Sequence, residues 1–181
     1  LVDANLVSRT GSESASWMRY ATTLIQIPLG LVPVAESLAA LPTLSQHAAA
    51  GRWPEYRTTF ARGLRLVLVL LVPSIVGLYI LAEPIVRLLF QHGNFVAYDT
   101  VWTARALHLY LLGLGFAGVD FLLNYAFYAR QNTRTPAIVG IMAVGVYLVV
   151  ALVLLEPLGF LGLVLADSAK HIAHACVMWV L

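Results

Sequence analysis

The chain has 181 residues, of which 60% are hydrophobic and 11% charged, and its mean hydropathy is +0.83. A soluble domain carries about 25% charged residues, so this composition excludes an ordinary water-soluble fold. A net charge of +2 gives no electrostatic case for binding nucleic acid. No zinc-ligand spacing, glycine-rich phosphate loop or nucleophile motif indicates an enzyme or a cofactor.

Five long apolar segments, separated by short polar connections, predict membrane-spanning helices. They cover residues 17–44, 64–81, 101–128, 137–155 and 160–181. A helix of about 20 apolar residues spans the hydrocarbon core of a bilayer, which is about 30 Å thick. We therefore expect residues 1–181 to form an all-α, polytopic transmembrane helix bundle. The chain has no initiating methionine, and we expect it to be an internal piece of a larger membrane protein.

The charge of the connections alternates along the chain and predicts an orientation. The connections 46–65 and 129–135 are the basic ones, with Arg52, Arg57, Arg62, Arg65, Arg130 and Arg134. Because Lys and Arg accumulate on the cytoplasmic side, we expect these two connections to face the cytoplasm and the others to face outward. The apolar run 84–90 is too short to span and predicts an interfacial or re-entrant helix.

The first span is irregular and carries polar residues at membrane depth. Pro28 and Pro33 predict kinks, because proline lacks a backbone donor and clashes with the preceding turn. A kinked membrane helix is packed by neighbours or lines a wet cavity. We interpret this span as a bent helix that borders a transport path, with Gln26 and Glu36 facing inward. The alternative is a kinked packing helix with Glu36 near the cytoplasmic interface.

The third span holds Asp120 near its middle, where a carboxyl group needs a partner, a proton or water. Asn124 lies one turn further on the same face. Asp120 is therefore either one half of a structural pair or a residue of a transport pathway. Arg105 and His108 lie near the outer end of the span, and we expect their side chains to reach outward to the interface.

The last span carries four polar residues on one helical face. They are Asp167, Lys170, His171 and His174, at positions i, i+3, i+4 and i+7. Asp167 can pair with Lys170 or His171, and the imidazoles, which titrate at about pH 6.5 when unperturbed, are candidates for carrying protons. A structural polar seam closed by another part of the protein is the alternative. Three such residues on one helix are weak evidence for a metal site, and we predict none.

Short strings along the whole chain resemble those of one transporter family. They are YA at 20–21, IPLG at 27–30, LPTLS at 41–45, LAEPI at 81–85, LLFQHGNF at 88–95, FYARQNTRTP at 127–136 and GL at 162–163. In this order and at this spacing, the chain resembles the lipid II flippases of the MurJ/MviN type, within the multidrug/oligosaccharidyl-lipid/polysaccharide exporter superfamily.

The resemblance implies a two-lobed fold of fourteen helices, in which the five spans are about helices eight to twelve and form most of the second lobe. It implies alternating-access translocation of a lipid-linked peptidoglycan precursor, lipid II, across the bacterial cytoplasmic membrane. The expected partners are this precursor, membrane lipids and possible further subunits of a membrane complex, with no cofactor. The alternatives are an exporter of another polyprenyl-linked glycan and a non-transporting membrane scaffold.

The resemblance also suggests site residues, with two departures on the first span. Many family members carry an arginine at the place of Thr23, and some an acid at the place of Gln26. A guanidinium is suited to bidentate contact with phosphate, which threonine cannot make. Asp3 lies where members carry an acid near the end of the seventh helix, and it is our candidate for cation coupling. The candidate substrate-pathway residues are Thr23, Gln26, Glu36, Asp120, Asp167 and Lys170; no catalytic residue is predicted.

Overall fold

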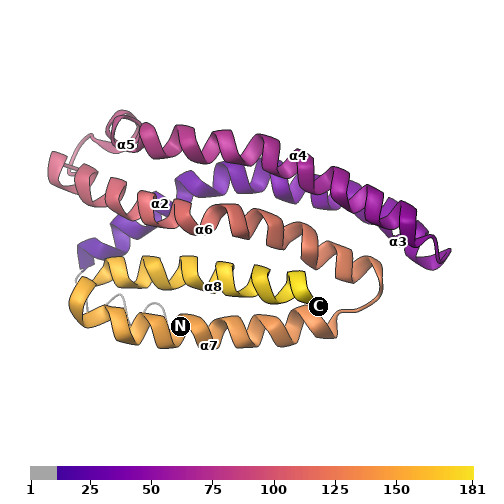
Figure 1. Ribbon diagram of the computed structural model, residues 1–181. Helices are drawn as coiled ribbons and strands as arrows, with labels where there is room; N and C mark the ends of the chain where they lie inside the picture. The colour runs from indigo at the N-terminus through magenta and orange to yellow at the C-terminus, as the bar shows by residue number, and fades with distance from the viewer. Residues whose placement is uncertain (1–11) are drawn as a thin grey trace.

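The computed structural model is a bundle of long helices that run roughly along one common direction (Figure 1). It describes residues 12–181. In chain order the elements are α2 (Ser12–Leu29), the π-helical η1 (Gly30–Val34), α3 (Ala35–Ala49), α4 (Trp53–Ile80), α5 (Ala82–Phe90), α6 (Ala97–Ala129), α7 (Arg134–Leu158) and α8 (Phe160–Val180). The described part of the chain contains no strand, so the prediction of an all-α fold is confirmed.

Five helical stretches are long and apolar enough to cross a membrane. They are Glu13–Ala49, Trp53–Ile80, Ala97–Ala129, Arg134–Leu158 and Phe160–Val180. Each overlaps one of the five apolar segments of the sequence, which confirms the number and the order of the predicted spans. The bundle is therefore polytopic, as the composition indicated.

The second span begins earlier than the sequence predicted. α3 continues to Ala49 and α4 begins at Trp53, so most of the stretch 46–65 is helical and only its centre is a turn. Pro54 is tolerated in the first turn of α4, because an N–H group there has no helical acceptor. Gly51 closes the turn with a φ of 66°, a conformation that side-chain-bearing residues rarely adopt. The expectation of a long basic loop was wrong.

α6 is the central helix of the bundle. In its most apolar window 56% of the residues are buried, against 17% in α4 and in α7. α2, α3, α4 and α5 pack against one side of α6, whereas α8 packs against the other and is itself covered by α7 (Figure 1). The outer faces of α4 and α7 expose apolar side chains such as Val69 and Ile141, as expected of surfaces that face lipid.

The first span is interrupted at its prolines, as predicted. Pro33 is buried inside the π-helical segment Gly30–Val34, and the hydroxyl of Ser37 donates a 2.6 Å hydrogen bond to the Pro33 carbonyl. Figure 1 shows α2 crossing the bundle obliquely before α3 runs beside α4. The segment lies against α6, where a Cβ on Gly118 would be 3.1 Å from the Pro33 ring. The irregular turn is therefore packed by a neighbouring helix.

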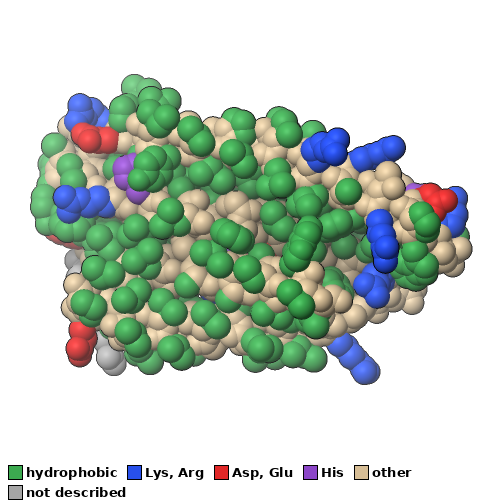
Figure 2. All heavy atoms as spheres, in the orientation of Figure 1, with side chains coloured by type: hydrophobic (Ala, Val, Ile, Leu, Met, Phe, Trp, Pro, Cys, Tyr) green, Lys and Arg blue, Asp and Glu red, His purple; other side chains and the backbone are tan. Residues whose placement is uncertain are grey.

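Charged side chains gather toward the two ends of the bundle, with a hydrophobic band between them on the face shown in Figure 2. The α3–α4 turn and the α6–α7 connection lie at the same end, so the two basic stretches share it (Figure 1). The short helix α5 lies at the opposite end and packs against α6. The arrangement is that of a bundle whose apolar middle is matched to a bilayer.

Candidate functional site

The contact between α6 and α8 is close enough to fix how their polar residues face each other. A Cβ on Gly113 would lie 2.6 Å from the Cα of Ser168, so any larger residue would collide with the α8 backbone. The hydroxyl of Ser168 also donates a 2.8 Å hydrogen bond to the Leu109 carbonyl. Small residues at a helix interface allow such close approach in membranes.

Two turns further along this contact, Asp120 of α6 meets His174 of α8. The His174 Nδ1 atom lies 2.5 Å from the Asp120 Oδ1 atom, and the two side chains are only 11% and 14% exposed. The amide of Asn124 donates to the backbone carbonyl of Asp120 over 2.7 Å. Asp120 thus has the partner that a carboxyl group at membrane depth requires. A role for it in a transport pathway stays a prediction.

The remaining polar residues of α8 form a second, more open cluster. Lys170 Nζ lies 2.5 Å from Asp167 Oδ1, as expected for this pair, and His171 Nε2 lies 3.8 Å from Asp167 Oδ2. These three side chains are each about 30% exposed, and Lys170 also lies 5.9 Å from the ring centre of Tyr147 on α7. We call Asp120, Asp167, Lys170, His171 and His174 the α6–α8 polar network.

The sequence did not reveal the Asp120–His174 contact, although a signal for it exists. Gly113 precedes Asp120 by seven residues, and Ser168 precedes His174 by six. If the two small residues mark a contact between helices that run in the same direction, the next polar pair must meet about two turns further along. The pairing therefore depends on the tertiary contact, which the polar stripe of α8 alone does not give.

The polar residues of α2 lie apart from the α6–α8 polar network. Arg19, Thr23 and Gln26 follow one another at i, i+4 and i+7, and all three are exposed. The Thr23 hydroxyl donates a 2.9 Å hydrogen bond to the Arg19 carbonyl of its own helix. Within residues 12–181 no hydrogen bond or ion pair is found between these three side chains and the network. We call Arg19, Thr23 and Gln26 the α2 polar face.

Glu36 lies on neither of these surfaces. A Cβ on Gly63 of α4 would be 3.0 Å from Glu36 Oε1 and 3.4 Å from the Leu122 side chain of α6. The half-buried Glu36 side chain therefore points between α3, α4 and α6. The predicted pathway residues thus fall in three places, and Asp3 lies outside the described residues.

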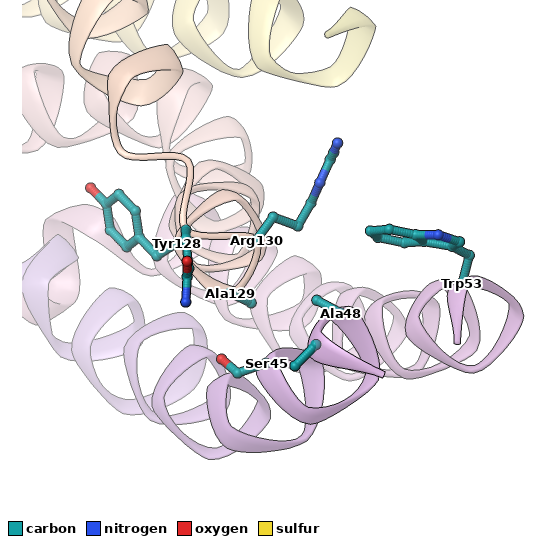
Figure 3. Close-up of a pocket in the computed structure, with 8 residues that line it drawn as sticks. Ser45, Ala48, Trp53, Tyr128, Ala129 and Arg130 are labelled. Carbon is teal, nitrogen blue, oxygen red and sulfur yellow. The ribbon is translucent and has the colours of Figure 1, made fainter. Parts of the chain in front are cut away.

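A pocket of about 540 Å³ opens at the end of the bundle that carries the basic stretches. Its lining consists of Ser45, Ala48, Ala49, Trp53, Tyr128, Ala129, Arg130 and Gln131. Figure 3 shows the Trp53 side chain, at the start of α4, extending toward the side of Arg130, which follows the end of α6, and the guanidinium carbon lies 5.8 Å from the Trp53 ring centre. Tryptophan and arginine in this arrangement are typical of a membrane–water interface. None of the predicted site residues lines the pocket.

The histidines and carboxylates of α8 do not converge on a single point. Asp167 contacts Lys170 and His171, whereas His174 is directed toward Asp120. Among residues 12–181 no group of three or more His, Cys, Asp or Glu side chains has the geometry to hold a metal ion. The network is therefore a set of pairwise contacts.

Comparison with known proteins finds similarity along the whole chain. The family model described as "Lipid II flippase MurJ" matches residues 1–181. A probable lipid II flippase MurJ of Haemophilus influenzae is 32% identical over 186 residues, which cover 99% of this chain and 36% of the relative. The lipid II flippase MurJ of Burkholderia cenocepacia is 34% identical over 171 residues, which cover 92% of this chain and 32% of the relative. The chain thus spans about a third of the length of the curated relatives it matches.

A solved structure agrees with these relatives. The structure described as "Lipid II flippase MurJ, inward closed conformation" superposes with a TM-score of 0.90 at 29% sequence identity, over 99% of this chain and 38% of that chain. Because the family model covers the chain from end to end, the chain belongs to the MurJ family of lipid II flippases, which are multi-pass membrane transporters and not enzymes.

Proposed function

We propose that a protein containing this chain moves lipid II, the lipid-linked peptidoglycan precursor, across the bacterial cytoplasmic membrane by alternating access. The observation that carries this proposal is the TM-score of 0.90 over 99% of the chain with a lipid II flippase. In this proposal the five spans are about helices eight to twelve of fourteen and form most of the second lobe. The precursor and the membrane lipids are then the partners, together with any further subunits.

The substrate path runs along the α2 polar face. Thr23 and Gln26 are exposed within an otherwise apolar span. Exposed polar side chains at membrane depth are tolerated where a helix borders a water-filled cavity, and this supports the placement of the path. Arg19 lies one turn before Thr23 on the same face and supplies a guanidinium close to the position where the family resemblance implies one. Glu36, Asp120, Asp167 and Lys170 remain further candidates for the path, and Asp3 remains the candidate for cation coupling.

In the proposed orientation, the connections 46–65 and 129–135 lie in the cytoplasm. The support is that both basic stretches lie at one end of the bundle, as the accumulation of Lys and Arg on that side requires. The test uses the full-length protein with Cys176 and any other native cysteine replaced by alanine. A cysteine at Gln131 is expected to resist a membrane-impermeant thiol reagent in intact cells, whereas one at Asn94 is labelled. Labelling in the opposite sense would overturn the orientation.

Complementation tests the proposed activity. The full-length gene is expressed in a bacterium depleted of its own lipid II flippase, and both growth and the appearance of lipid II on the outer face are measured. We expect rescue by the wild-type protein and loss of rescue on Arg19→Ala, with Arg87→Ala as the control because Arg87 pairs with Glu83 at the surface of α5. Failure of the wild-type protein, despite normal membrane expression, would contradict the proposal. Intact transport after Glu36→Gln or Asp120→Asn would remove those residues from the path.

A second candidate substrate is another polyprenyl-linked glycan. The observation that favours it is Thr23, because threonine cannot make the bidentate phosphate contact of the arginine that the family resemblance implies at this place. The same depletion strain distinguishes the two, since an exporter of another glycan restores neither growth nor outward lipid II. A non-transporting scaffold gives the same negative result, but it is also dispensable for export of any polyprenyl-linked glycan in its own host.

A further inference from the structure

The α6–α8 polar network carries an unbalanced charge inside two predicted spans. Its carboxylates are Asp120 and Asp167, and its permanent cation is Lys170. With both imidazoles neutral, the network therefore has one net negative charge. An uncompensated charge at membrane depth is costly, and a single bound proton removes it.

The buried end of the network is the part that has no permanent cation. Lys170 lies against Asp167, which leaves Asp120 as the carboxylate without a permanent cation. Asp120 instead contacts His174 through the Nδ1 atom of the imidazole. The other ring nitrogen, Nε2, faces Gly140 of α7, where an added Cβ would be 3.9 Å away. Because glycine has no side chain, no side chain at position 140 covers the Nε2 atom of His174.

We propose that Asp120 and His174 together bind one exchangeable proton inside the bundle. The proton adds to Nε2 of His174, while the Nδ1–H group continues to donate to Asp120, so that an imidazolium–carboxylate pair forms. Release of the proton from Nε2 returns a neutral imidazole and leaves the negative charge on Asp120. The inference concerns proton binding alone and does not depend on which substrate the protein moves.

The network also contains a path from its exposed end to this pair. Asp167 and His171 are each about 30% exposed, whereas His174 is 11% exposed. Seven residues of helix separate Asp167 from His174, a rise of about 10 Å, and His171 lies between them on the same face. His171 is thus positioned to pass protons between the half-exposed carboxylate and the buried pair.

The other titratable groups on the helices around the pair have contacts of their own. On α7, the Tyr147 ring faces Lys170. Glu36 is directed toward Gly63 of α4, and the Tyr56 hydroxyl donates a 2.6 Å hydrogen bond to the Ala126 carbonyl. Within the described part of the chain, His171 is therefore the remaining neutral group of the network that competes for the proton.

Infrared difference spectroscopy on the full-length protein in lipid nanodiscs tests the proposal. With isotope-labelled histidine, a step in pH between about 5 and 8 is expected to change the imidazole bands of the wild-type protein. His174→Leu is expected to remove one component of that change, and the control His171→Leu is expected to leave that component in place. A wild-type spectrum without a histidine component that His174→Leu removes would overturn the proposal.

Labelling of the carboxyl group gives a second, independent measurement. Dicyclohexylcarbodiimide reacts with protonated carboxyl groups in apolar surroundings, and mass spectrometry quantifies the product at Asp120. We expect little product in the wild-type protein, where the proton resides on His174. We expect a several-fold increase in His174→Leu, where Asp120 must hold the proton itself, and no increase in His171→Leu. Equal labelling of Asp120 in folded wild-type and His174→Leu proteins would contradict the proposal.

Discussion

The α6–α8 polar network and the α2 polar face both place polar side chains in apolar spans, but they solve the problem differently. In the network, Asp120 and His174 satisfy each other across two helices. On α2, the hydroxyl of Thr23 donates a hydrogen bond to a backbone carbonyl of the same helix, and the Gln26 side chain is exposed. A polar group in lipid needs a partner or water. The comparison therefore indicates that the polar groups of the network find partners on a neighbouring helix of the bundle, whereas the side chains of the α2 polar face remain open to partners outside it.

Gly113→Val should produce the largest effect, because it separates the two helices that carry the network. The added atoms would collide with the backbone at Ser168, and the loss of stability should be about 3 kcal/mol. Thermal unfolding of the full-length protein in detergent measures it. The matched control is Gly145→Val on α7, where nothing lies within 4 Å of an added Cβ. Equal stability of the two variants would show that the close α6–α8 contact is absent in solution.

His174→Leu should have the next largest effect, since it leaves Asp120 buried without its partner. The expected cost is about 1–3 kcal/mol, measured by the same unfolding assay. The double variant with Asp120→Leu should recover most of this loss, because it removes both polar groups together. Additive losses in the double variant would mean that the two side chains do not interact.

Asp167→Asn should have a small effect, because the ion pair that it breaks is about 30% exposed at both residues. Half-exposed pairs contribute about 0–1 kcal/mol, and that contribution falls with added salt. Unfolding at low and high ionic strength checks this. A loss as large as that of His174→Leu would remove the distinction between the open and the buried ends of the network.

Thr23→Ala and Gln26→Ala should leave stability within about 0.5 kcal/mol of the wild type, since neither side chain packs in the interior. The complementation assay should nevertheless show reduced transport if these residues border the substrate path. If the alanine variants lost stability while the folded protein transported normally, the α2 polar face would have a structural role, and its contrast with the α6–α8 polar network would be lost.

The spans were predictable because length and apolar content suffice to identify a membrane helix. The start of α4 was not, because Arg57, Arg62 and Arg65 give its first turns the composition of a loop. Those arginines are nevertheless compatible with helix, since arginine is a good helix former and its long side chain can reach the interface. The charged residues of a helix indicate where it crosses the membrane–water interface. Where the helix ends depends instead on turn residues such as Gly51.

The candidate site was only half predictable. The stripe of Asp167, Lys170 and His174 follows from helical periodicity, which is local information. The partner of Asp120 depends on which helix packs against α6, and a single sequence does not give that contact. The direction of Glu36 was likewise hidden, because it depends on the irregular turn that precedes it.

That turn has a geometric consequence for the first span. In a regular helix each residue rotates by about 100°, so Gln26 and Glu36 would project within about 80° of each other. A π-helical turn accommodates one extra residue and shifts the azimuth of everything after it by about 100°. Glu36 is thereby rotated to nearly the opposite side from Gln26 and points at Gly63. One inserted residue thus lets a single span present different chemistry in two directions, inward along α3 and outward along α2.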